Sequence, residues 1–357
     1  MISDINSWYS GRRVFVTGHT GFKGTWLTAW LVRAGAKVTG YALEPEDTGL
    51  FRQSGLATHV DSRIADICDR DSLRSALTES RPEIVFHLAA QSLVRRSYSD
   101  PVETYRTNVL GTVQLLDELR NLPSAKAAVI VTSDKCYDNR NKTVPYAEED
   151  PMGGHDPYSS SKGCAELATA AFRRSFFSNG SPAVASARAG NVIGGGDWAE
   201  DRLIPDIMRA AALGAPAVIR NADAVRPWQF VLEPLRGYLM LGSALVERGQ
   251  EFAGAWNFGP GNSDEIAVAA LAERVAAAQG SVSLRRETQT NAPHEASLLK
   301  LDSRKAAELL KWHPAISLER AVELTVAGYA AFDSAEDVLS EVNRILNEYW
   351  NDVDATA

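Results

Sequence analysis

The sequence predicts an α/β fold in which a doubly wound parallel sheet is joined to a smaller C-terminal lobe. Over the first half of the chain, short runs of β-branched and small residues alternate with longer amphipathic runs, and near residue 190 this alternation stops. Strands that alternate with helices form βαβ units, whose strands pair in parallel. At 357 residues the chain also exceeds the usual range of a single domain, so we expect two parts.

The expected strands and helices follow from these runs and from the glycines and prolines between them. The strands of the first part are expected at residues 13–17, 37–42, 64–66, 84–88, 129–132 and 183–187. The first helix is expected over 24–34, because Gly35 can take the left-handed conformation that ends helices at little steric cost. Two amphipathic helices of the second part are expected over 266–278 and 318–331.

The change of pattern near residue 190 predicts the division of the chain. Residues 1–190 are expected to form the first part and to carry the catalytic residues. Residues 191–357 are expected to form mainly the substrate-binding lobe, with residues 220–260 returning to the first part. Within this second half, a glycine-rich loop and several prolines break the chain into short segments: Pro205, Pro216, Pro227 and Pro234.

Composition excludes several classes of function. Lys and Arg number 37 against 45 Asp and Glu, a net charge of -8 without long runs of either sign, so we expect neither nucleic acid nor a membrane as partner. The three cysteines, Cys68, Cys136 and Cys164, lack the spacing of a zinc site and suit a reducing compartment. No segment approaches the roughly 20 apolar residues of a spanning helix, and no secretion signal opens the chain. We therefore expect a cytoplasmic protein without a bound metal.

A glycine-rich heptapeptide directly follows the first expected strand and opens the first expected helix. Residues 18–24 read Gly-His-Thr-Gly-Phe-Lys-Gly. Glycines at such a turn let backbone N–H groups approach a pyrophosphate, whose charge the helix N-terminus favours. Glycines also serve in ordinary tight turns, but the strand before and the helix after favour a dinucleotide site. The first part is therefore expected to be of the Rossmann type.

The end of the second strand bears on the choice of dinucleotide. An acid there usually holds the adenosine ribose, but the position is Ala42 and the nearest acid is Glu44. Because neither Ala42 nor Leu43 is an arginine that would receive a 2′-phosphate, we expect NAD, bound more weakly than usual. The residues expected around it are Gly18, Thr20, Gly21, Phe22, Lys23, Gly24, Asp66, Ile67, Leu88, Ala89, Ala90, Thr107, Tyr158 and Lys162.

Tyr158 and Lys162 lie four residues apart, so on a helix they share a face. Tyrosine titrates near 10, but a neighbouring ammonium favours the phenolate. Tyr158 can then accept a hydroxyl proton as hydride leaves for nicotinamide, while Lys162 holds the cofactor ribose. This spacing also arises by chance on many helices. The glycine turn upstream and Ser133, which follows the fifth expected strand, favour the catalytic interpretation.

These features resemble the extended short-chain dehydrogenase/reductase family over most of the chain. Within it, the nucleotide-sugar 4,6-dehydratases carry an acid and a base directly after the Ser or Thr, commonly Asp-Glu, whereas epimerases and simple reductases lack the pair. Here those positions are Asp134 and Lys135. Together with the glycine heptapeptide and the string Arg-Pro-Trp-Gln-Phe-Val-Leu-Glu-Pro at 226–234, they resemble the dehydratases that act on CDP-glucose.

The resemblance implies a lyase that releases CDP-4-keto-6-deoxyglucose and water. Oxidation at C4 acidifies the C5 proton; a base removes that proton while an acid protonates the departing C6 hydroxyl, and hydride then returns to C6. We expect Asp134 to be the acid and Lys135 the base. A lysine titrates near 10.4, so the pKa of Lys135 must fall through desolvation or through cations such as Lys162. The alternative is a surface ion pair between Asp134 and Lys135.

Substrate contacts are expected from the second half of the chain and from the loop after the fourth strand. A diphosphate in an acidic protein needs local cations, and arginine binds it with two hydrogen bonds. Arg188 is either such a contact or a buried structural arginine, and His87 is expected to pack beside the sheet. Neither Cys136 nor Cys164 has the histidine that a nucleophile needs. The expected substrate residues are Gln91, Ser92, Asn191, Trp198, Arg202, Arg226 and His294.

Three alternatives remain open. An epimerase or reductase of nucleotide sugars would use Ser133, Tyr158 and Lys162 alone, and a 4,6-dehydratase could act on another nucleotide-glucose, because the cytosine preference rests on resemblance only. A dinucleotide sensor without catalysis would not need Tyr158 or Lys162. The resemblance further implies a homodimer or homotetramer and deoxysugar supply for bacterial surface polysaccharide, such as the O-antigen of lipopolysaccharide.

Overall fold

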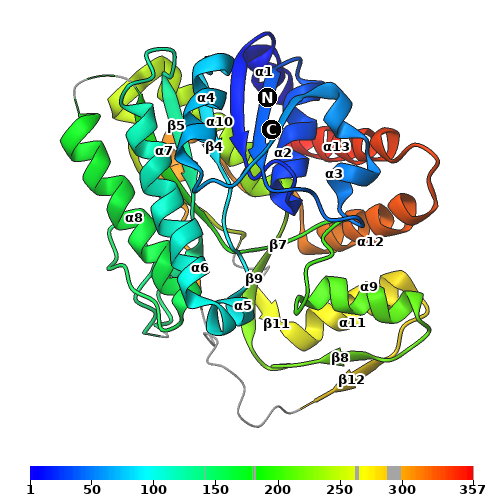
Figure 1. Cartoon of the computed structure of the whole chain (residues 1–357). Coiled ribbons are helices and arrows are strands. Elements are labelled where there is room, and N and C mark those ends of the chain that lie inside the picture. Colours follow the sequence, from blue (N-terminus) through cyan, green and yellow to red (C-terminus); the bar gives the residue numbers. More distant parts are fainter. Residues whose placement is uncertain (141, 179, 181, 262–264, 288–298, 357) are drawn as a thin grey trace.

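The computed structural model describes residues 1–356 apart from 141, 179, 181, 262–264 and 288–298. A central parallel sheet lies between two layers of helices, and a smaller lobe lies below it in the view of Figure 1. The predicted α/β class, with a doubly wound parallel sheet and a smaller lobe, is confirmed.

Among the described residues the central sheet has seven strands, in the order β10-β6-β5-β4-β1-β2-β3, and every neighbouring pair is parallel. The strand order reverses between β1 and β4, which leaves a crevice at the carboxyl ends of these two strands. The strands are β1 (Arg13–Thr17), β2 (Lys37–Ala42), β3 (Asp61–Ile64), β4 (Ile84–His87), β5 (Ala127–Val131), β6 (Ala183–Ala189) and β10 (Gly254–Phe258).

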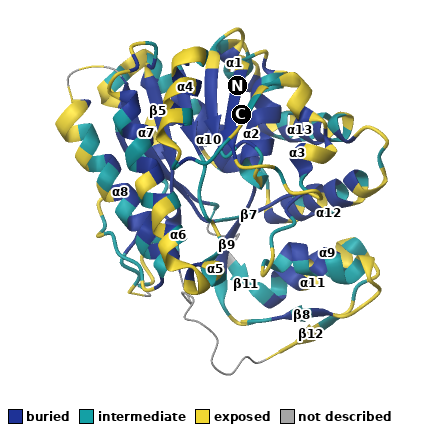
Figure 2. Cartoon of the chain, viewed as in Figure 1, coloured by how far each residue is buried: buried dark blue, intermediate teal, exposed yellow. Residues whose placement is uncertain are grey.

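Helices cover both faces of the sheet. On one face, α2 and α10 pack on the strands with α1 and α13 outside them, and α4, α7 and α8 cover the other face. Successive residues of β1 serve the two cores: Val14 and Val16 lie in one apolar cluster and Phe15 in the other. Figure 2 shows the strands buried between the layers. The helices are α1 (Ile2–Tyr9), α2 (Phe22–Arg33), α4 (Arg70–Ser80), α7 (Gly111–Leu119), α8 (Pro157–Phe176), α10 (Leu232–Arg248) and α13 (Val338–Thr356).

The lobe and the connections complete the chain. The lobe is built from small sheets of the order β11-β9-β7 and β12-β8 with helices α9 and α11. Its elements are β7 (Asn191–Ile193), α9 (Leu203–Ala212), β8 (Ala217–Ile219), β9 (Val225–Phe230), β11 (Glu265–Ala267), α11 (Val268–Gln279), β12 (Leu284–Arg286) and α12 (Leu318–Ser334). The shorter connecting helices are α3 (Leu50–Gln53), η1 (Leu56–His59), α5 (Val94–Ser99), α6 (Pro101–Tyr105), η2 (Arg106–Leu110), η3 (Asp134–Cys136), η4 (Gly249–Glu251) and η6 (Ala306–Leu310).

Segments from the second half of the chain return to the central sheet. Strand β10 pairs in parallel with β6, and α10 packs on β5 and β6. Helix α13 contacts α1 and α2. None of the described helices combines the length and the apolar character that a membrane crossing requires.

Several predicted boundaries differ from those in the structure: the fifth strand spans Ala127–Val131 rather than residues 129–132, and the sixth continues to Ala189 rather than ending at residue 187. Two other differences have a clear physical cause. The third strand spans Asp61–Ile64 rather than residues 64–66, because it is the edge strand and its extent follows its pairing with Thr39–Ala42 of β2 rather than an apolar run. The first helix begins at Phe22 rather than residue 24, since Gly21 in extended conformation is already its N-cap. The helix therefore starts within the glycine heptapeptide.

The glycine turn between β1 and α2 depends on close backbone contacts. Gly18 has a φ of +74°, and a Cβ added there would lie 2.7 Å from the backbone nitrogen of Ala89. A Cβ added to Gly24 would lie 1.9 Å from the carbonyl oxygen of Gly18. Since real Cβ atoms do not approach backbone so closely, the first turn of α2 can pack on this loop only with glycine there.

We expect Gly24→Ala to lower the free energy of unfolding by about 2 kcal/mol, because the added methyl must push the turn apart. Urea unfolding followed by circular dichroism measures this. Gly180→Ala is the control: a Cβ there would meet no described atom within 4 Å, so its effect should stay within about 0.5 kcal/mol. Equal stability of the two variants would contradict the close packing of the turn.

Candidate active site

A cavity of about 670 Å³ opens at the carboxyl ends of β1, β4 and β5, between the sheet and the lobe. The glycine turn, the segment after β5 and helix α8 line it from one side, and Asn191, Arg202 and Arg226 line it from the lobe. Every described residue that the sequence predicted for cofactor, catalysis or substrate lies on its wall. His294 lies outside the described residues.

The glycine turn fits a dinucleotide. The backbone of residues 18–24 faces the cavity without side chains at Gly18, Gly21 and Gly24, and the N-terminus of the twelve-residue helix α2 begins there. These are the conditions under which N–H groups approach a pyrophosphate. Across the turn, the backbone N–H groups of Leu88 and Ala89 each donate to the Thr17 hydroxyl over 3.1 Å, which fixes the opposite wall.

Beside β2, at the end of the cavity where the adenosine of a dinucleotide would lie, the nearby carboxylates already form ion pairs with arginines. Ala42 ends β2 on the cavity wall, and the Glu44 carboxylate pairs with Arg52 at 2.9 Å. The Asp66 carboxylate accepts from the Cys68 N–H at 2.8 Å and pairs with Arg106 at 2.9 Å. Asp66 is thus held at the wall, whereas the usual ribose-binding acid is replaced by Ala42.

The residues after β5 form a short 3-10 turn, η3. The Ser133 hydroxyl accepts from the backbone N–H of Lys135 at 3.2 Å and donates to the Asp134 carboxyl at 2.9 Å. Asp134 is only 4% exposed, so a surface ion pair is excluded for it. Burial raises the pKa of Asp134, although Lys135, Ser133, Arg226 and Lys23 counteract that rise. A raised pKa makes this carboxyl easier to protonate than an exposed aspartate, which is the direction that an acid catalyst requires.

Tyr158 and Lys162 point from helix α8 into the same cavity, and both are buried. Burial raises the pKa of Tyr158 to about 12, so the expected lowering by the Lys162 ammonium was wrong. The reason is that desolvation of a phenolate outweighs the nearby positive charges. Burial also lowers the pKa of Lys162 to about 8, against the Glu166 carboxylate that raises it. The Lys135 ammonium lies 5.8 Å from the centre of the Tyr158 ring.

Lys23 extends the cluster of cations. Burial, followed by repulsion from Arg202, lowers the pKa of Lys23 to about 8, while Asp134 raises it. The sequence predicted Lys23 as a cofactor contact only. The structure also brings it into electrostatic range of Asp134 and Lys162, two predicted catalytic residues.

The predicted substrate residues connect the two parts of the molecule. Arg202 pairs with Asp197 at 2.8 Å and donates to the Ser92 hydroxyl at 3.2 Å, so it joins the lobe to the loop after β4. Trp198 packs edge-on against Tyr329, with ring centres 5.0 Å apart. The Gln91 amide bonds to its own loop and to Thr104 at 2.9 Å. Arg226 is buried on β9 at the cavity wall.

Sequence reasoning missed Arg95 and Arg220, which also line the cavity. Asp201 pairs with both, at 3.6 Å to Arg95 and 2.5 Å to Arg220, and Arg220 also pairs with Asp206 at 2.5 Å. The sequence did contain an indication that Arg220 lies at the site, because it is only six residues before Arg226, which was predicted to bind substrate. It was weak because the strand that positions Arg220, β8, has only three residues.

Three further residues lie away from the cavity wall. Arg188 is buried and pairs with Glu166 at 2.7 Å, which is the structural alternative foreseen for it. Cys136 is fully buried, and burial raises the pKa of its thiol. The His87 ring bonds to the hydroxyls of Thr17 at 2.7 Å and Thr112 at 3.0 Å. Within the described part of the chain, no group of three or more His, Cys, Asp or Glu residues is placed to hold a metal.

A family model described as GDP-mannose 4,6 dehydratase matches residues 15–325. The CDP-glucose 4,6-dehydratase of Salmonella typhimurium strain LT2 is 48% identical over 354 residues, which cover 98% of each chain. The chain belongs to the extended short-chain dehydrogenase/reductase family. The resemblance inferred from residues 18–24, 133–135 and 226–234 and from the Tyr158/Lys162 pair is therefore confirmed.

Solved structures of extended short-chain dehydrogenases/reductases share the fold. The epimerase Mth375 from Methanothermobacter thermautotrophicus superposes with a TM-score of 0.79 at 25% identity, covering 100% of this chain and 98% of its own. A dTDP-glucose 4,6-dehydratase from Streptomyces venezuelae, solved with NAD and TYD bound, superposes with a TM-score of 0.77 at 22% identity. The match covers 89% of this chain and 97% of that protein's chain. At this identity, the second likeness concerns the fold alone.

We expect the buried His87 to lower stability in acid. Burial lowers its pKa to about 3, whereas an unfolded histidine titrates near 6.5. Between these values only the unfolded state binds the proton, so stability falls as pH drops from about 6.5. In His87→Gln, which keeps a donor and an acceptor, the slope from pH 6 to 4.5 should be shallower by about 1.4 kcal/mol per pH unit.

Urea unfolding at several pH values checks this slope, and near-ultraviolet circular dichroism at pH 7.5 verifies that the variant is folded. Identical slopes in the two proteins would contradict a neutral, buried His87.

Proposed function

We propose that the protein is a lyase that converts CDP-glucose to CDP-4-keto-6-deoxyglucose and water, with NAD as a bound cofactor that each turnover regenerates. The observation that carries this proposal is the buried Asp134 beside Lys135 and Ser133, in one cavity with Tyr158 and Lys162. The 48% identity to a CDP-glucose 4,6-dehydratase over nearly the whole chain supports it.

NAD supplies reversible hydride acceptance when it is bound in the cavity. The glycine turn and the N-terminus of α2 would hold its pyrophosphate, because their N–H groups and the helix dipole favour an anion there. Lys162 would hold the nicotinamide-side ribose. Leu88, Ala89 and Ala90 provide a wall of small and apolar side chains along the cofactor.

Tyr158 begins the chemistry by accepting the proton of the C4 hydroxyl, and Ser133 shares that proton. Because burial raises the pKa of Tyr158 to about 12, its ionisation requires a nearby cation. Lys162 supplies this charge below its own pKa of about 8. We propose that the Lys162 ammonium, together with the Arg202 guanidinium and the Ser133 hydrogen bond that lower the pKa of Tyr158, offsets part of the effect of burial and stabilises the phenolate that oxidation at C4 needs.

Asp134 and Lys135 carry out the elimination. Lys135 takes the C5 proton that the C4 ketone has made acidic, and Asp134 protonates the departing C6 hydroxyl as water. Burial raises the pKa of Asp134, which favours its protonation relative to an exposed aspartate. Hydride from the reduced cofactor would then add to C6 while protonated Lys135 returns its proton to C5, so C6 has exchanged its bond to oxygen for a bond to hydrogen, C4 remains oxidised, and no net redox occurs.

The cations of the cavity favour a nucleoside diphosphate sugar. The net charge is -8, yet Arg202, Arg220 and Arg226 line the cavity from the lobe. Guanidinium groups bind diphosphate with paired hydrogen bonds. An epimerase or reductase would need Ser133, Tyr158 and Lys162 but not a buried acid beside Lys135. Dehydration is therefore favoured, because it gives Asp134 and Lys135 a role as well.

The resemblance extends to setting and assembly. Deoxysugar supply for bacterial surface polysaccharide such as O-antigen, in the cytoplasm, fits the proposed product. A homodimer or homotetramer is supported by exposed apolar side chains on α6, η2 and α8: Val102, Leu110 and Leu167. The three helices pack against one another, and monomeric proteins rarely expose large contiguous apolar patches.

Substrate choice can be tested directly. The protein is incubated with NAD and, separately, CDP-, UDP-, GDP- and dTDP-glucose, and mass spectrometry follows the loss of one water. We expect CDP-glucose to lose water faster than the other three. Loss with another nucleotide alone would keep the lyase and correct the base, and loss with none would overturn the lyase assignment.

Lys135→Ala tests the base. We expect the variant to fold and to bind NAD, but kcat for dehydration should fall by about 100-fold or more, as when a positioned base is removed. Reduced cofactor should then accumulate, since oxidation at C4 does not need Lys135. Lys126→Ala is the control, because Lys126 is exposed before β5. Normal turnover in Lys135→Ala would remove the residue from the mechanism.

A further inference from the structure

We propose that Glu166 is a positioning residue that locks the catalytic helix α8 to the catalytic end of β5, with Arg188 and Tyr137 extending the lock to η3. The inference rests on the proposed function, since it assigns the supports of Tyr158, Lys162, Ser133 and Lys135.

Glu166 lies on α8 four residues after Lys162 and eight after Tyr158, so the three share one helix face. Its carboxylate accepts from the Thr132 hydroxyl at 2.5 Å and from the Ser186 hydroxyl at 2.7 Å. Thr132 directly precedes Ser133, and Ser186 lies on β6. One buried carboxylate therefore joins the helix that carries the phenol and the ammonium to the strand end that carries the serine.

Arg188 neutralises this carboxylate and extends the connection. Its guanidinium pairs with Glu166 at 2.7 Å and donates to the Tyr137 hydroxyl at 2.7 Å. Both members of the pair are 4% exposed. Although burial raises the pKa of Glu166, Arg188 and the hydroxyl donors hold it below its usual range, so the carboxylate stays ionised. Loss of one partner would leave an uncompensated charge in the core.

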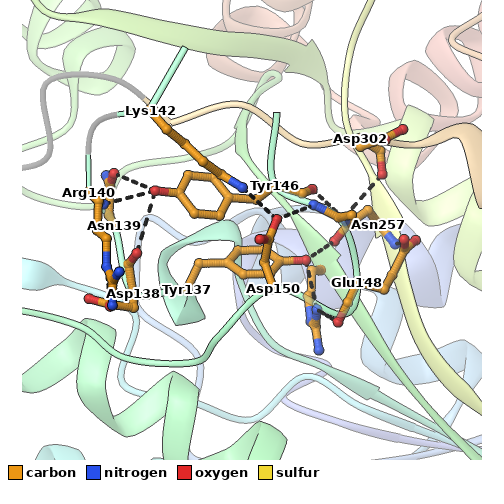
Figure 3. A network of polar contacts seen from close by, with 12 residues as sticks. Tyr137, Asp138, Asn139, Arg140, Lys142, Tyr146, Glu148, Asp150, Asn257 and Asp302 are labelled. Carbon is orange, nitrogen blue, oxygen red and sulfur yellow. Dashed lines mark hydrogen bonds and ion pairs between the residues drawn. The ribbon is translucent and has the colours of Figure 1, made fainter. Parts of the chain in front are cut away.

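Tyr137 connects this hydrogen-bond network to the second half of the chain. It follows η3 directly, and its hydroxyl donates to the Asn257 amide oxygen at 2.8 Å. Asn257 in turn binds the carbonyl oxygens of Tyr146 at 2.9 Å and Asp302 at 3.1 Å, and its backbone N–H donates to Glu148 at 2.9 Å. Figure 3 shows Tyr137, Tyr146, Glu148, Asn257 and Asp302 converging from these segments. The turn that holds Lys135 is thus fixed from both sides.

Glu166 also acts on Lys162 through charge. The titratable groups that interact electrostatically with Lys162 are Glu166 on its own helix, Cys136 of η3, His87 of β4 and Lys23 of α2. Among them Glu166 is the carboxylate, and it raises the pKa of Lys162 against burial. Removing its charge should lower the pH at which Lys162 loses its proton. Merely structural support of the helix would not move that pH.

The first test is Glu166→Gln, which keeps the shape and removes the charge. NMR of lysine-labelled protein follows the Lys162 side chain without requiring turnover. We expect its titration midpoint to move down by about one pH unit, and the alkaline limb of kcat to move with it at unchanged KM. Glu166→Asp retains the charge and should restore the midpoint. An unshifted midpoint in folded Glu166→Gln would overturn the electrostatic role.

The second test serves if Glu166→Gln does not fold. Thr132→Val removes only the hydroxyl that bonds to Glu166, and kcat should fall about tenfold, as when a hydrogen bond to a charged group is lost. Thr169→Val is the matched control: this buried hydroxyl of α8 donates to the Ala165 carbonyl and not to the strand end. Equal kcat in the two variants would overturn the positioning role.

Failure of the proposed function would look different. In that case the wild-type protein releases no water from any of the four nucleotide-glucoses, while the NMR midpoints still decide the role of Glu166.

Discussion

The burial of both faces of the parallel sheet constrains everything else in this protein. Helices cover the inner strands on each side, so most of their side chains are apolar and the polar ones, such as Ser186 and Arg188, are paired within the protein. Polar groups can meet a ligand where these strands end. The reversal of strand order between β1 and β4 opens one crevice at the carboxyl ends. The glycine turn, the segment after β4 and Ser133 all lie at that edge, which is why three distant stretches of sequence line one cavity.

Within the cavity, burial is the largest cause of the pKa shifts of the ionisable side chains. Desolvation disfavours the ionised forms of Tyr158, Asp134, Lys23 and Lys162 alike. It therefore raises the pKa of the Asp134 carboxyl and lowers the pKa of the two lysines to about 8, where they can change state during a reaction. The positive charge that the cavity of this acidic protein offers to a diphosphate therefore comes from the arginines of the lobe, Arg202, Arg220 and Arg226.

The second half of the chain stabilises the first in two ways, by extending and covering the sheet and by polar contacts to the segment after β5. Strand β10 and helix α10 extend and cover the sheet, and Asn257 at the end of β10 receives the polar contacts of Tyr137. The buried pair of Glu166 and Arg188 lies between this support and the catalytic helix. A buried ion pair contributes little net stability but tolerates few alternative arrangements, which suits groups that must fix geometry.

The sequence by itself determined the features that local physics dictates. β1 and β2 matched their predicted bounds, the glycine turn was placed because only glycine permits its close contacts, and Tyr158 and Lys162 were paired by helical spacing. The tertiary structure alone decided what depends on neighbours distant in sequence. The edge strand β3 takes its bounds from β2, Arg220 reaches the cavity through a three-residue strand, and Glu166 acquires its role from partners on β5 and β6. The pKa of Tyr158 rose instead of falling for the same reason, because desolvation depends on all the atoms that surround the phenol and not on its spacing from one lysine.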